Sequence, residues 1–493
     1  MPVLKKVVVI GGGFGGLATA CLLAKQGHRV TLLEKNEQLG GRAGVYKHDG
    51  FVFDMGPSWY LMPDVFENFF NSLGEDVNDY FMLTKLSPSY QVFFKDVLNK
   101  PIDIFGDITK DTQTFDSIEP GSGKVLAEYL KKSEYVYNTA IDKFLYKNYT
   151  SAKDFLSPKL ALEARKLSLF SNMDRYVKKY FKSPELQKIL QYPLVFLVSS
   201  PYNAPAIYSL MSHVDFNQGV YYPQGGFGSV VQALIAIAKK YGVSLHTDSE
   251  VTKIVTKNGR ATGVIRNDEH IAADIVISNA DIHHTETKLL TQTERDHSTK
   301  YWNTRTLAPS ALLMYLGVKG ALPNFQHHNL IFSKDWHRNF AQIFDQPTWP
   351  EDPSLYISNP SKTDHTVAPK GYENMFVLVP IATGLSYTEQ ELEDYSNKIL
   401  KTIEHETKTP QLRKNIVYKK LFCVDDFATR YNSFQGTGLG LAHTLKQTAL
   451  FRPKNTSKKV KNLYFVGANT HPGIGVPMTL ISAELTVRQI SKY

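Results

Sequence analysis

The sequence predicts an α/β fold in which a Rossmann-like nucleotide-binding domain is assembled from discontinuous segments. Residues 5–10 form an apolar strand, residues 11–16 hold five glycines, residues 15–26 are helical in pattern and residues 29–34 form a second strand. Strand, glycine turn, helix and strand in this order make a βαβ unit. Similar segments recur at residues 219–280 and 461–492. We therefore expect distant parts of the chain to share one parallel sheet.

Two other kinds of sequence separate these segments. Residues 96–211 are rich in Lys, Leu, Tyr and Phe at helical spacing, and residues 301–454 mix strands such as SALLMYLGV with polar stretches. The first predicts a helical region that faces a membrane or the substrate, and the second predicts an inserted α+β substrate domain. The nucleotide-binding domain is then expected to comprise residues 1–95, 212–300 and 455–493.

Composition limits the classes of function. The chain has 493 residues, of which 42% are hydrophobic, 21% charged and 12% aromatic, so it is long enough for two or three globular domains. The aromatic side chains fit either core packing or the lining of an apolar ligand site. The net charge of +9 occurs without a nucleic-acid-binding motif. It therefore favours weak attraction to a membrane surface over binding of nucleic acid.

Cysteine content and hydropathy favour a cytoplasmic protein. Only Cys21 and Cys423 are present, which excludes a disulfide framework and a cysteine metal site. No run reaches the roughly 18 uninterrupted apolar residues of a spanning helix. The apolar stretch at 189–211 is too short and too interrupted to span. It would dip into one leaflet, frame the mouth of a ligand tunnel or belong to the buried core.

The glycine cluster between the first strand and the first helix predicts a dinucleotide site. Gly11, Gly13 and Gly16 have the GxGxxG spacing, and they lie between a strand and a helix, which is the context that gives this motif its meaning. Gly11 permits the tight turn, Gly13 lets the backbone approach a pyrophosphate, and Gly16 lets the helix pack closely on the strand. The positive end of the helix then attracts the phosphates.

The residues after the second strand favour FAD. Glu34 lies 18 residues after Gly16 and ends that strand, where its carboxylate can accept hydrogen bonds from a ribose hydroxyl. An acid at this place argues against the 2′-phosphate of NADP. A second glycine pair at 40–41 and Arg42 follow shortly afterwards. Arg42 would reach the phosphates or be a solvated loop residue.

The loop before the C-terminal helix supports the same cofactor. Gly467 ends a strand, Gly473 and Gly475 permit close backbone approach, and Pro477 suits the first turn of a helix. The N-terminus of that helix would stabilise negative charge on a reduced flavin. His471 in this loop would contact cofactor or substrate, or serve only in packing.

The remaining polar motifs are expected to be structural. The glycine loops at 224–229 and 436–440 have no nucleotide-binding context of their own. The histidine pairs at 283–284 and 327–328 lack the i, i+4 spacing of a helical metal site and are expected at the surface or in packing. No zinc motif and no Ser-His-Asp arrangement can be argued from spacing.

Taken together, these segments resemble the bacterial-type phytoene desaturase family, whose members are FAD-dependent carotenoid desaturases of the flavin amine oxidase-like superfamily. The resemblance covers nearly the whole chain. It is carried by the opening fingerprint and by LGGRAGVYKHDGFVFDMGPSWY, GVYYPQGGFGSVVQAL, VISNADIHHT and NLYFVGANTHPGIGVPMTLISAE. The first and last stretches are the most specific.

The resemblance implies function, cofactor, partners and site residues. It implies non-covalent FAD, desaturation of phytoene to more conjugated carotenes in carotenoid biosynthesis, an apolar tunnel for the linear polyene, and peripheral docking on the inner face of the cell membrane. Quinone or oxygen would reoxidise the flavin. Asp154 in SAKDFL would be a catalytic residue, or alternatively an exposed helix-cap aspartate. The implied FAD contacts are Gly11, Gly13, Gly16, Glu34, Arg42, Val251, Gly467, Gly473, Gly475 and Val476.

Departures from the family pattern leave alternatives open. Asn469 stands where the family often has glycine, and Met478 and Thr479 stand where it has small residues. These differences leave the number of desaturations and the choice of C30 or C40 substrate open. A diapophytoene desaturase, a carotenoid isomerase or ketolase and an amine oxidase are alternatives on the same flavin fold. A non-catalytic lipid- or prenyl-binding escort is a further alternative.

Overall fold

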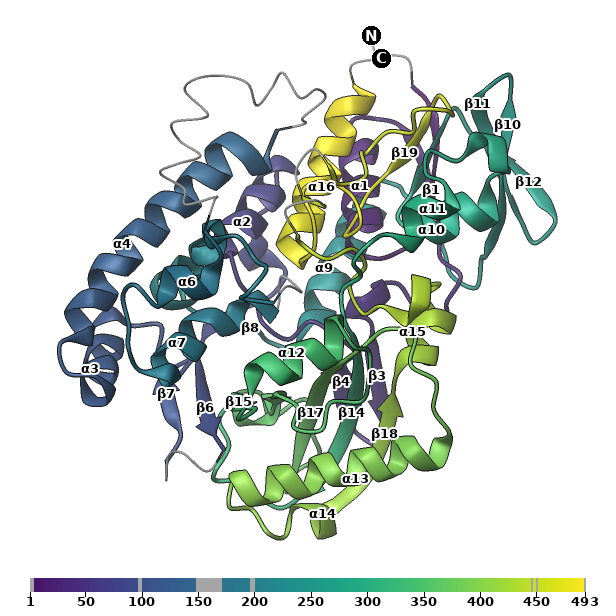
Figure 1. Ribbon diagram of the computed structural model, residues 1–493. Helices are drawn as coiled ribbons and strands as arrows, with labels where there is room; N and C mark the ends of the chain where they lie inside the picture. Colours follow the sequence, from purple (N-terminus) through teal and green to yellow (C-terminus); the bar gives the residue numbers. More distant parts are fainter. Residues whose placement is uncertain are drawn as a thin grey trace.

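The computed structural model describes residues 4–95, 100–147, 171–195, 200–444, 447–448 and 451–491. Two large sheets organise this part of the chain: a five-stranded parallel sheet and a seven-stranded mixed sheet. In Figure 1 the parallel sheet lies in the upper half and the mixed sheet in the lower half. The predicted α/β fold with a Rossmann-like sheet and a second, mixed sheet is thereby confirmed.

The parallel sheet has the strand order β19-β13-β1-β2-β9. Its strands are β1 (Lys6–Ile10), β2 (Arg29–Leu33), β9 (Ser244–His246), β13 (Ile275–Ser278) and β19 (Leu463–Phe465). All four neighbouring pairs run parallel. The three distant segments of the sequence therefore build one sheet.

Both faces of the parallel sheet are buried, which explains its almost wholly apolar strands. Val7 and Val9 of β1 pack against three helices, whereas Val8 and Ile10 point to the opposite face. The three helices are α1 (Phe14–Lys25), α9 (Phe227–Lys240) and α16 (Val476–Ile490). A three-stranded antiparallel sheet covers the other face, formed by β10 (Val251–Lys257), β11 (Arg260–Arg266) and β12 (Glu269–Ala272).

The mixed sheet has the order β18-β14-β17-β16-β15-β6-β7. Its strands are β6 (Tyr90–Phe94), β7 (Ile102–Ile104), β14 (Ser310–Lys319), β15 (His328–Phe332), β16 (Leu355–Ser358), β17 (Tyr372–Ile381) and β18 (Ile416–Phe422). Leu312 and Met314 of β14 pack on the side covered by α13 (Glu389–Glu406), and Leu313 and Tyr315 face the other side. The period-2 pattern thus divides the residues of β14 between two cores.

The pairing of β6 differs from the predicted domain limits. β6 pairs in parallel with β15, so residues up to 94 enter the mixed sheet, although the predicted nucleotide-binding domain extended to residue 95. Such a pair joins strands that are far apart in sequence and leaves no local signal. The domain limits themselves stay a prediction.

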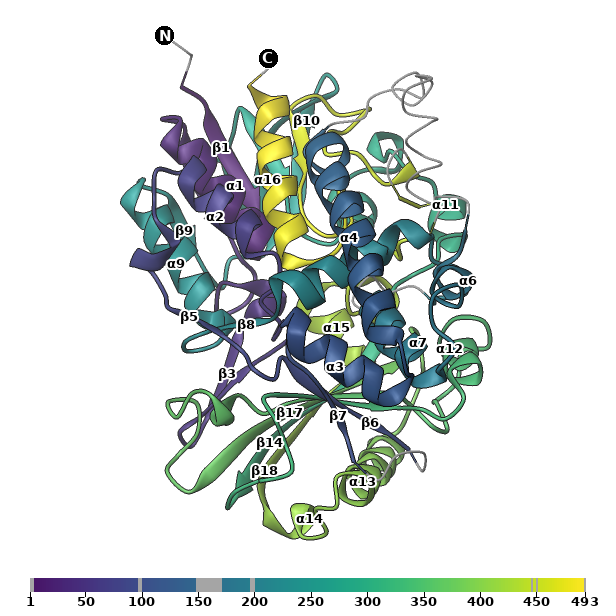
Figure 2. The ribbon, with the colours of Figure 1, turned by 90° about the vertical axis from the view of Figure 1, so that its left-hand side faces the viewer.

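The helices of the predicted insert are α3 (Ile108–Ile118), α4 (Ser122–Ala140), α6 (Met173–Val177), α7 (Pro184–Gln191) and α8 (Leu210–Ser212). α2 (Pro63–Ser72) precedes the insert and packs against α16. Figure 2 shows α4 running alongside α16, and Tyr137 of α4 shares a core with Met62, Ile481 and Leu485. Asp154 lies outside the described residues.

Shorter elements complete the chain. β3 (Val45–His48) and β4 (Phe51–Asp54) form a hairpin, and β5 (Leu83–Lys85) pairs antiparallel with the distant β8 (Tyr221–Pro223). The remaining α-helices in the described part of the chain are α10 (Ile282–His284), α11 (Thr299–Asn303), α12 (Trp336–Phe344), α14 (Leu412–Asn415) and α15 (Val424–Tyr431). No helix within the described ranges has both the length and the apolar composition that crossing a membrane requires.

Candidate functional site

A cavity of about 1000 Å³ is lined by residues from both large sheets and from the helical insert. One part of its wall is formed by the glycine loops before α1 and α16. The other part is formed by apolar side chains of the mixed sheet, of α12 and of the insert. The cavity therefore joins a polar, backbone-rich region to an apolar one.

The N-terminus of α1 opens onto this cavity. Gly11 and Gly13 line it, and Gly13 is the N-cap residue of α1 without any side-chain cap. The first N–H groups of α1 therefore have no side-chain acceptor in the helix cap, as an anion site requires. Gly16 has a different role, because a Cβ there would lie 2.0 Å from Gly11 O. It does not line the cavity and instead lets the helix pack on β1, as predicted.

Glu34 is fixed at the end of β2 by backbone donors. Its Oε2 accepts a hydrogen bond from Gly12 N at 2.7 Å, and its Oε1 accepts one from Asn36 N at 2.9 Å. The side chain is buried and lines the cavity beside the glycine loop. These bonds hold an acidic acceptor where a ribose hydroxyl would be recognised.

Arg42 lines the cavity but its observed bonds go to protein atoms. Its Nε donates to Gly438 O and its Nη2 donates to Ser433 Oγ, each at 2.6 Å. The guanidinium also lies over the ring of Tyr431, 5.3 Å from the centroid. Burial lowers the pKa of Arg42. A phosphate contact by Arg42 therefore stays a prediction.

Asn279 and Asp281, two side chains that follow β13, were not among the predicted site residues. Asn279 donates from Nδ2 to Gly11 O at 3.4 Å, and Cβ atoms on Gly15 or Gly467 would lie 2.6 and 2.8 Å from its Oδ1. It is thus packed among the glycines of both cavity loops. The signal that predicts such a residue is its place directly after a buried strand, beside the end of β1.

Asp281 and Asn469 link that strand end to Leu441, the residue that follows the loop at 436–440. Asp281 accepts from His284 N at 3.1 Å and from Asn469 Nδ2 at 3.1 Å. Asn469 Oδ1 in turn accepts from Leu441 N at 2.9 Å. Burial raises the pKa of Asp281. The asparagine that departs from the family pattern therefore bridges a buried carboxylate and a backbone donor.

The loop before α16 forms the facing wall. Gly467, Gly475 and Val476 line the cavity, and Gly475 has φ +116° and caps α16 without a side chain. Gly473 does not line it. A Cβ on Gly473 would lie 2.3 Å from His443 Nε2, so this glycine makes room for the imidazole, which accepts from Ile474 N at 3.1 Å.

One more predicted FAD contact and two histidines also lie in the cavity wall. Val251, the first residue of β10, lines the cavity. His443 and His471 line it too, and burial lowers the pKa of His471 to about 4 and that of His443 well below its ordinary value. Both imidazoles are therefore neutral at physiological pH.

Aromatic rings form a continuous line through the apolar part of the cavity. Trp59 contacts Tyr192 at 6.0 Å between ring centroids, Tyr192 contacts Phe332 at 6.1 Å, and Phe332 contacts Trp336 at 5.0 Å. Phe340 then lies 5.7 Å from Trp336. Because all five residues line the cavity, they offer an elongated apolar surface.

The motifs that were predicted to be structural differ in whether they line the cavity. Asp54 accepts hydrogen bonds from Phe227 N and Gly228 N at the start of α9, so the loop at 224–229 is held away from the cavity wall. The loop at 436–440 contributes Gly438 and Leu439 to that wall. His327 and His328 are buried. In the part of the chain that the structure describes, no cluster of side chains suits a metal ion.

A family model for flavin containing amine oxidoreductases matches residues 14–491. The chain belongs to this family. It is 49% identical to the carotenoid 3,4-desaturase of Haloarcula japonica over 98% of this chain and 97% of the relative. It is 34% identical to the zeta-carotene-forming phytoene desaturase of Myxococcus xanthus over 99% of this chain and 94% of the relative. The resemblance stated from the motifs is thereby confirmed.

The amine oxidase fold is also seen in solved structures. A putrescine oxidase structure covers 100% of both chains with a TM-score of 0.63 at 12% identity, which shows a shared fold alone. The flavoprotein family implies FAD, and the site fits it. Two helix N-termini without side-chain caps, an acidic residue at the end of β2 and a cavity of about 1000 Å³ are all present.

Proposed function

We propose that this flavoprotein is a carotenoid desaturase, which removes two hydrogens from neighbouring carbons of a linear polyene. The observation that carries the proposal is the cavity that joins both glycine loops to a wall of aromatic rings. Such a wall suits a long apolar substrate without charged groups. The full-length likeness to two desaturases supports the same reaction.

For the position of the new double bond, we favour C3–C4 of a carotenoid. The 49% identical relative is a carotenoid 3,4-desaturase, whereas the relative that acts on phytoene is 34% identical. Phytoene, the substrate predicted from the motifs, is the second candidate and rests on that relative. The assay below separates the two.

The chain would contribute binding, orientation and exclusion of water. FAD supplies the hydride acceptor when bound, and quinone or oxygen would reoxidise it. Gly11, Gly13 and Glu34 would hold its adenosine diphosphate part, and the loop Gly473 to Val476 its flavin side. Aromatic side chains such as Trp59 would align the polyene. Asp154 remains a proposed catalytic residue.

We also propose peripheral docking on the cytoplasmic face of the cell membrane, where such a substrate dissolves. Two observations support it. The net charge is +9, which suits anionic lipid headgroups. Phe451 lines the cavity and yet is 65% exposed, so the apolar wall reaches the surface there.

The assay uses the FAD-loaded protein with liposomes that contain either lycopene or phytoene and a quinone. Each added conjugated double bond shifts the absorption of the extracted pigment to longer wavelength. A shift with lycopene supports 3,4-desaturation, and a new banded absorption with colourless phytoene supports the second candidate. If neither extract changes while flavin stays bound, carotenoid desaturation is contradicted.

A further inference from the structure

Two cationic side chains are almost completely removed from solvent in the part of the chain that the structure describes. Lys95 is 4% exposed and Arg452 is 2% exposed. Burying a charge is costly unless an opposite charge accompanies it. Both side chains therefore need a structural explanation.

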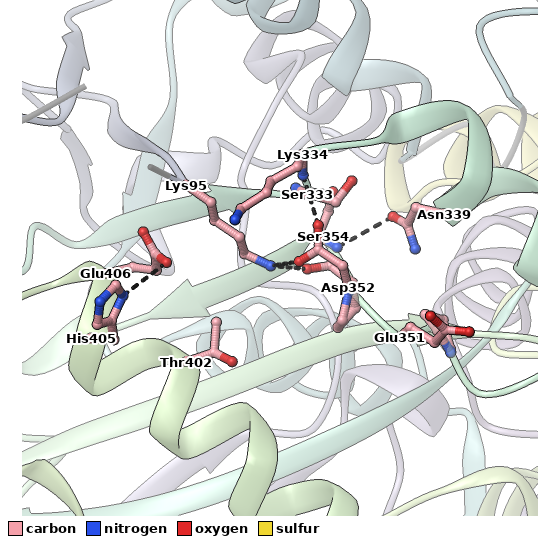
Figure 3. Close-up of polar contacts among 12 residues, drawn as sticks. Lys95, Ser333, Lys334, Asn339, Glu351, Asp352, Ser354, Thr402, His405 and Glu406 are labelled. Carbon is pink, nitrogen blue, oxygen red and sulfur yellow. Dashed lines mark hydrogen bonds and ion pairs between the residues drawn. The ribbon is translucent and has the colours of Figure 1, made fainter. Parts of the chain in front are cut away.

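Lys95, at the end of β6, has an acidic partner. Figure 3 shows its Nζ directed at the carboxylate of Asp352, with which it forms an ion pair. The same Nζ donates to Pro353 O at 2.9 Å. The other oxygen of Asp352 accepts from Lys334 N at 2.8 Å. The charge of Lys95 is thus neutralised by Asp352.

Arg452 is held by backbone oxygens. Its Nε donates to Thr470 O at 3.1 Å, and its Nη2 donates to Leu441 O at 3.1 Å and to Ala468 O at 2.5 Å. Among the described residues, Nη1 has no hydrogen-bond partner and no carboxylate pairs with the guanidinium. Burial lowers the pKa of Arg452 to about 10, so the side chain stays cationic at physiological pH. No opposite charge in this part of the chain compensates it.

The backbone oxygens that hold Arg452 belong to the loop between β19 and α16 and to its neighbour. Ala468 lines the cavity, and Thr470 directly precedes His471, which lines it as well. Arg452 itself does not line the cavity. Its guanidinium therefore lies directly behind the wall that this loop forms.

The charge of Arg452 acts on side chains of the cavity. After the larger effect of burial, it contributes to the lowered pKa values of His443 and His471, both of which line the cavity. Burial raises the pKa values of its neighbours Tyr208 and Tyr301, so neither phenol neutralises it at physiological pH. A charge that acts on these groups through a low-dielectric interior also acts on a ligand in the cavity.

We propose that Arg452 is the buried counter-charge of the reduced flavin. A hydride carries two electrons and one proton, so bound FAD becomes an anion when it accepts one. The guanidinium behind the loop stabilises this anion more than it stabilises the neutral, oxidised flavin. The midpoint potential is thereby raised, which favours hydride transfer from a hydrocarbon. This inference rests on the proposed place of the flavin beside the loop before α16, and not on the identity of the substrate.

The experiment measures the midpoint potential of the bound flavin without any polyene. The FAD-loaded protein is titrated anaerobically with dithionite beside a reference dye. Arg452→Gln removes the charge and keeps an amide donor for the loop oxygens. It is expected to weaken binding of reduced FAD, relative to oxidised FAD, at least tenfold, which lowers the two-electron potential by about 30 mV. Arg452→Lys keeps the charge and is expected to retain most of the potential.

The pH dependence of the potential gives a second measurement on the wild-type protein. If the reduced flavin stays anionic, each pair of electrons enters with one proton. Each pH unit is a tenfold change in proton concentration, so the potential then falls by about 30 mV per unit. Uptake of two protons doubles this slope. We expect the one-proton slope for the wild-type protein between pH 5.5 and 7.5, and a steeper slope for Arg452→Gln at the acid end.

The matched control is Lys95→Gln, which removes the other buried cation. Lys95 does not line the cavity, and its charge is already paired with Asp352. The potential of this variant is expected to equal that of the wild-type protein. Its stability serves as a reference for the loss of a buried cation as such.

The outcomes separate the charge of Arg452 from its backbone contacts. An unchanged potential in Arg452→Gln overturns the proposal, even if the variant is less stable or binds both forms of FAD more weakly. Equal lowering in Arg452→Lys, or in Lys95→Gln, overturns it as well. If Arg452→Gln does not fold, the wild-type slope decides: one proton per electron pair supports the counter-charge, and two protons overturn it. None of these results requires desaturation, so a failed pigment assay leaves them unaffected.

Discussion

At the scale of single residues, Gly13 and Gly16 of the first glycine loop have different physical roles, because Gly13 lines the cavity and Gly16 does not. A Cβ on Gly13 would lie 3.0 Å from Asn279 Nδ2 and 4.0 Å from Gly41 Cα, whereas a Cβ on Gly16 would lie 2.0 Å from the backbone oxygen of Gly11. Gly13 therefore leaves room for a ligand, and Gly16 lets α1 pack on β1.

This difference gives a paired prediction. Gly13→Val is expected to lower the affinity for FAD at least about tenfold, because a side chain obstructs the approach of the phosphates to the helix N-terminus. Flavin absorbance per protein after dialysis measures this. Gly16→Val is expected to lower Tm even without FAD, since α1 must move off the strand. A Gly13→Val protein that keeps its full complement of FAD would contradict the phosphate site.

Asn469 allows a second prediction at this scale. Asn469→Ala is expected to lower the free energy of unfolding by about 1–2 kcal/mol, because Leu441 N and the Asp281 carboxyl each lose a partner. Asn469→Asp keeps the acceptor for Leu441 N but places a second carboxyl beside Asp281, so its loss should be larger at pH 8 than at pH 5. Denaturant titrations at both pH values measure this. Equal losses in the free energy of unfolding at the two pH values would contradict repulsion between the two carboxyl groups.

At the scale of elements, the local pattern predicted the first βαβ unit well. The expected strand at 5–10 is β1 (Lys6–Ile10), and the expected helix at 15–26 is α1 (Phe14–Lys25). Strand hydrophobicity, glycine spacing and helix period all lie within one short segment there. The pairing of β6 with β15 was not predicted, because its partners Gln91 and Asn329 lie 238 residues apart.

The site shows the same difference between residues predicted from their sequence neighbours and residues that act through long-range contacts. Glycines and Glu34 are recognisable because their meaning comes from neighbours in sequence. Asn279, Asp281 and Asn469 act through contacts between segments that only folding brings together. Nε1 of Trp336 and Nδ2 of Asn339 in α12 also lack a hydrogen-bond partner among the described residues, and nothing in WHRNF predicts this.

Asp215 connects three elements and gives a prediction of pH dependence. Tyr90 of β6 and Tyr192 donate to its Oδ2 at 2.8 and 3.3 Å. Burial raises the pKa of Asp215 from 3.8 to about 7, with a further contribution from the nearby carboxyl of Asp111. Between about pH 4 and 7, the folded state therefore still holds a proton that the unfolded state has released. This stabilisation is complete below the unfolded pKa and is lost as the pH rises through the folded pKa.

The expected result is a stability that falls as the pH rises from 4 to 7, by up to about 4 kcal/mol from this group. Asp215→Asn mimics the protonated form and should reduce the slope. Some slope should remain, because burial also raises the pKa of Asp111, to about 6. Chemical unfolding across this range is the measurement. An unchanged slope in Asp215→Asn would show that Asp215 is not protonated in the folded protein.

At the scale of the whole molecule, one cavity runs from the parallel sheet to the mixed sheet and reaches the surface at Phe451. For the proposed polyene substrate, an opening at Phe451 would allow entry from a membrane without passage through water. The net charge of +9 supplies a long-range attraction to anionic lipid, and an exposed aromatic side chain supplies a short-range apolar contact. The proposed docking thus combines two forces that respond differently to salt.

Liposome sedimentation tests this combination. The bound fraction of the FAD-loaded protein is expected to rise with the content of anionic lipid and to fall as ionic strength increases, because salt screens exposed charges beyond about 10 Å at 0.1 M. Phe451→Ser should weaken binding several-fold at every ionic strength, since the apolar contact is not screened. Its control is Met82→Ser, because Met82 is 68% exposed but does not line the cavity. Equal weakening by both variants would mean that exposed apolar area, and not the cavity mouth, determines binding. No weakening by Phe451→Ser would place the docking surface elsewhere on the molecule.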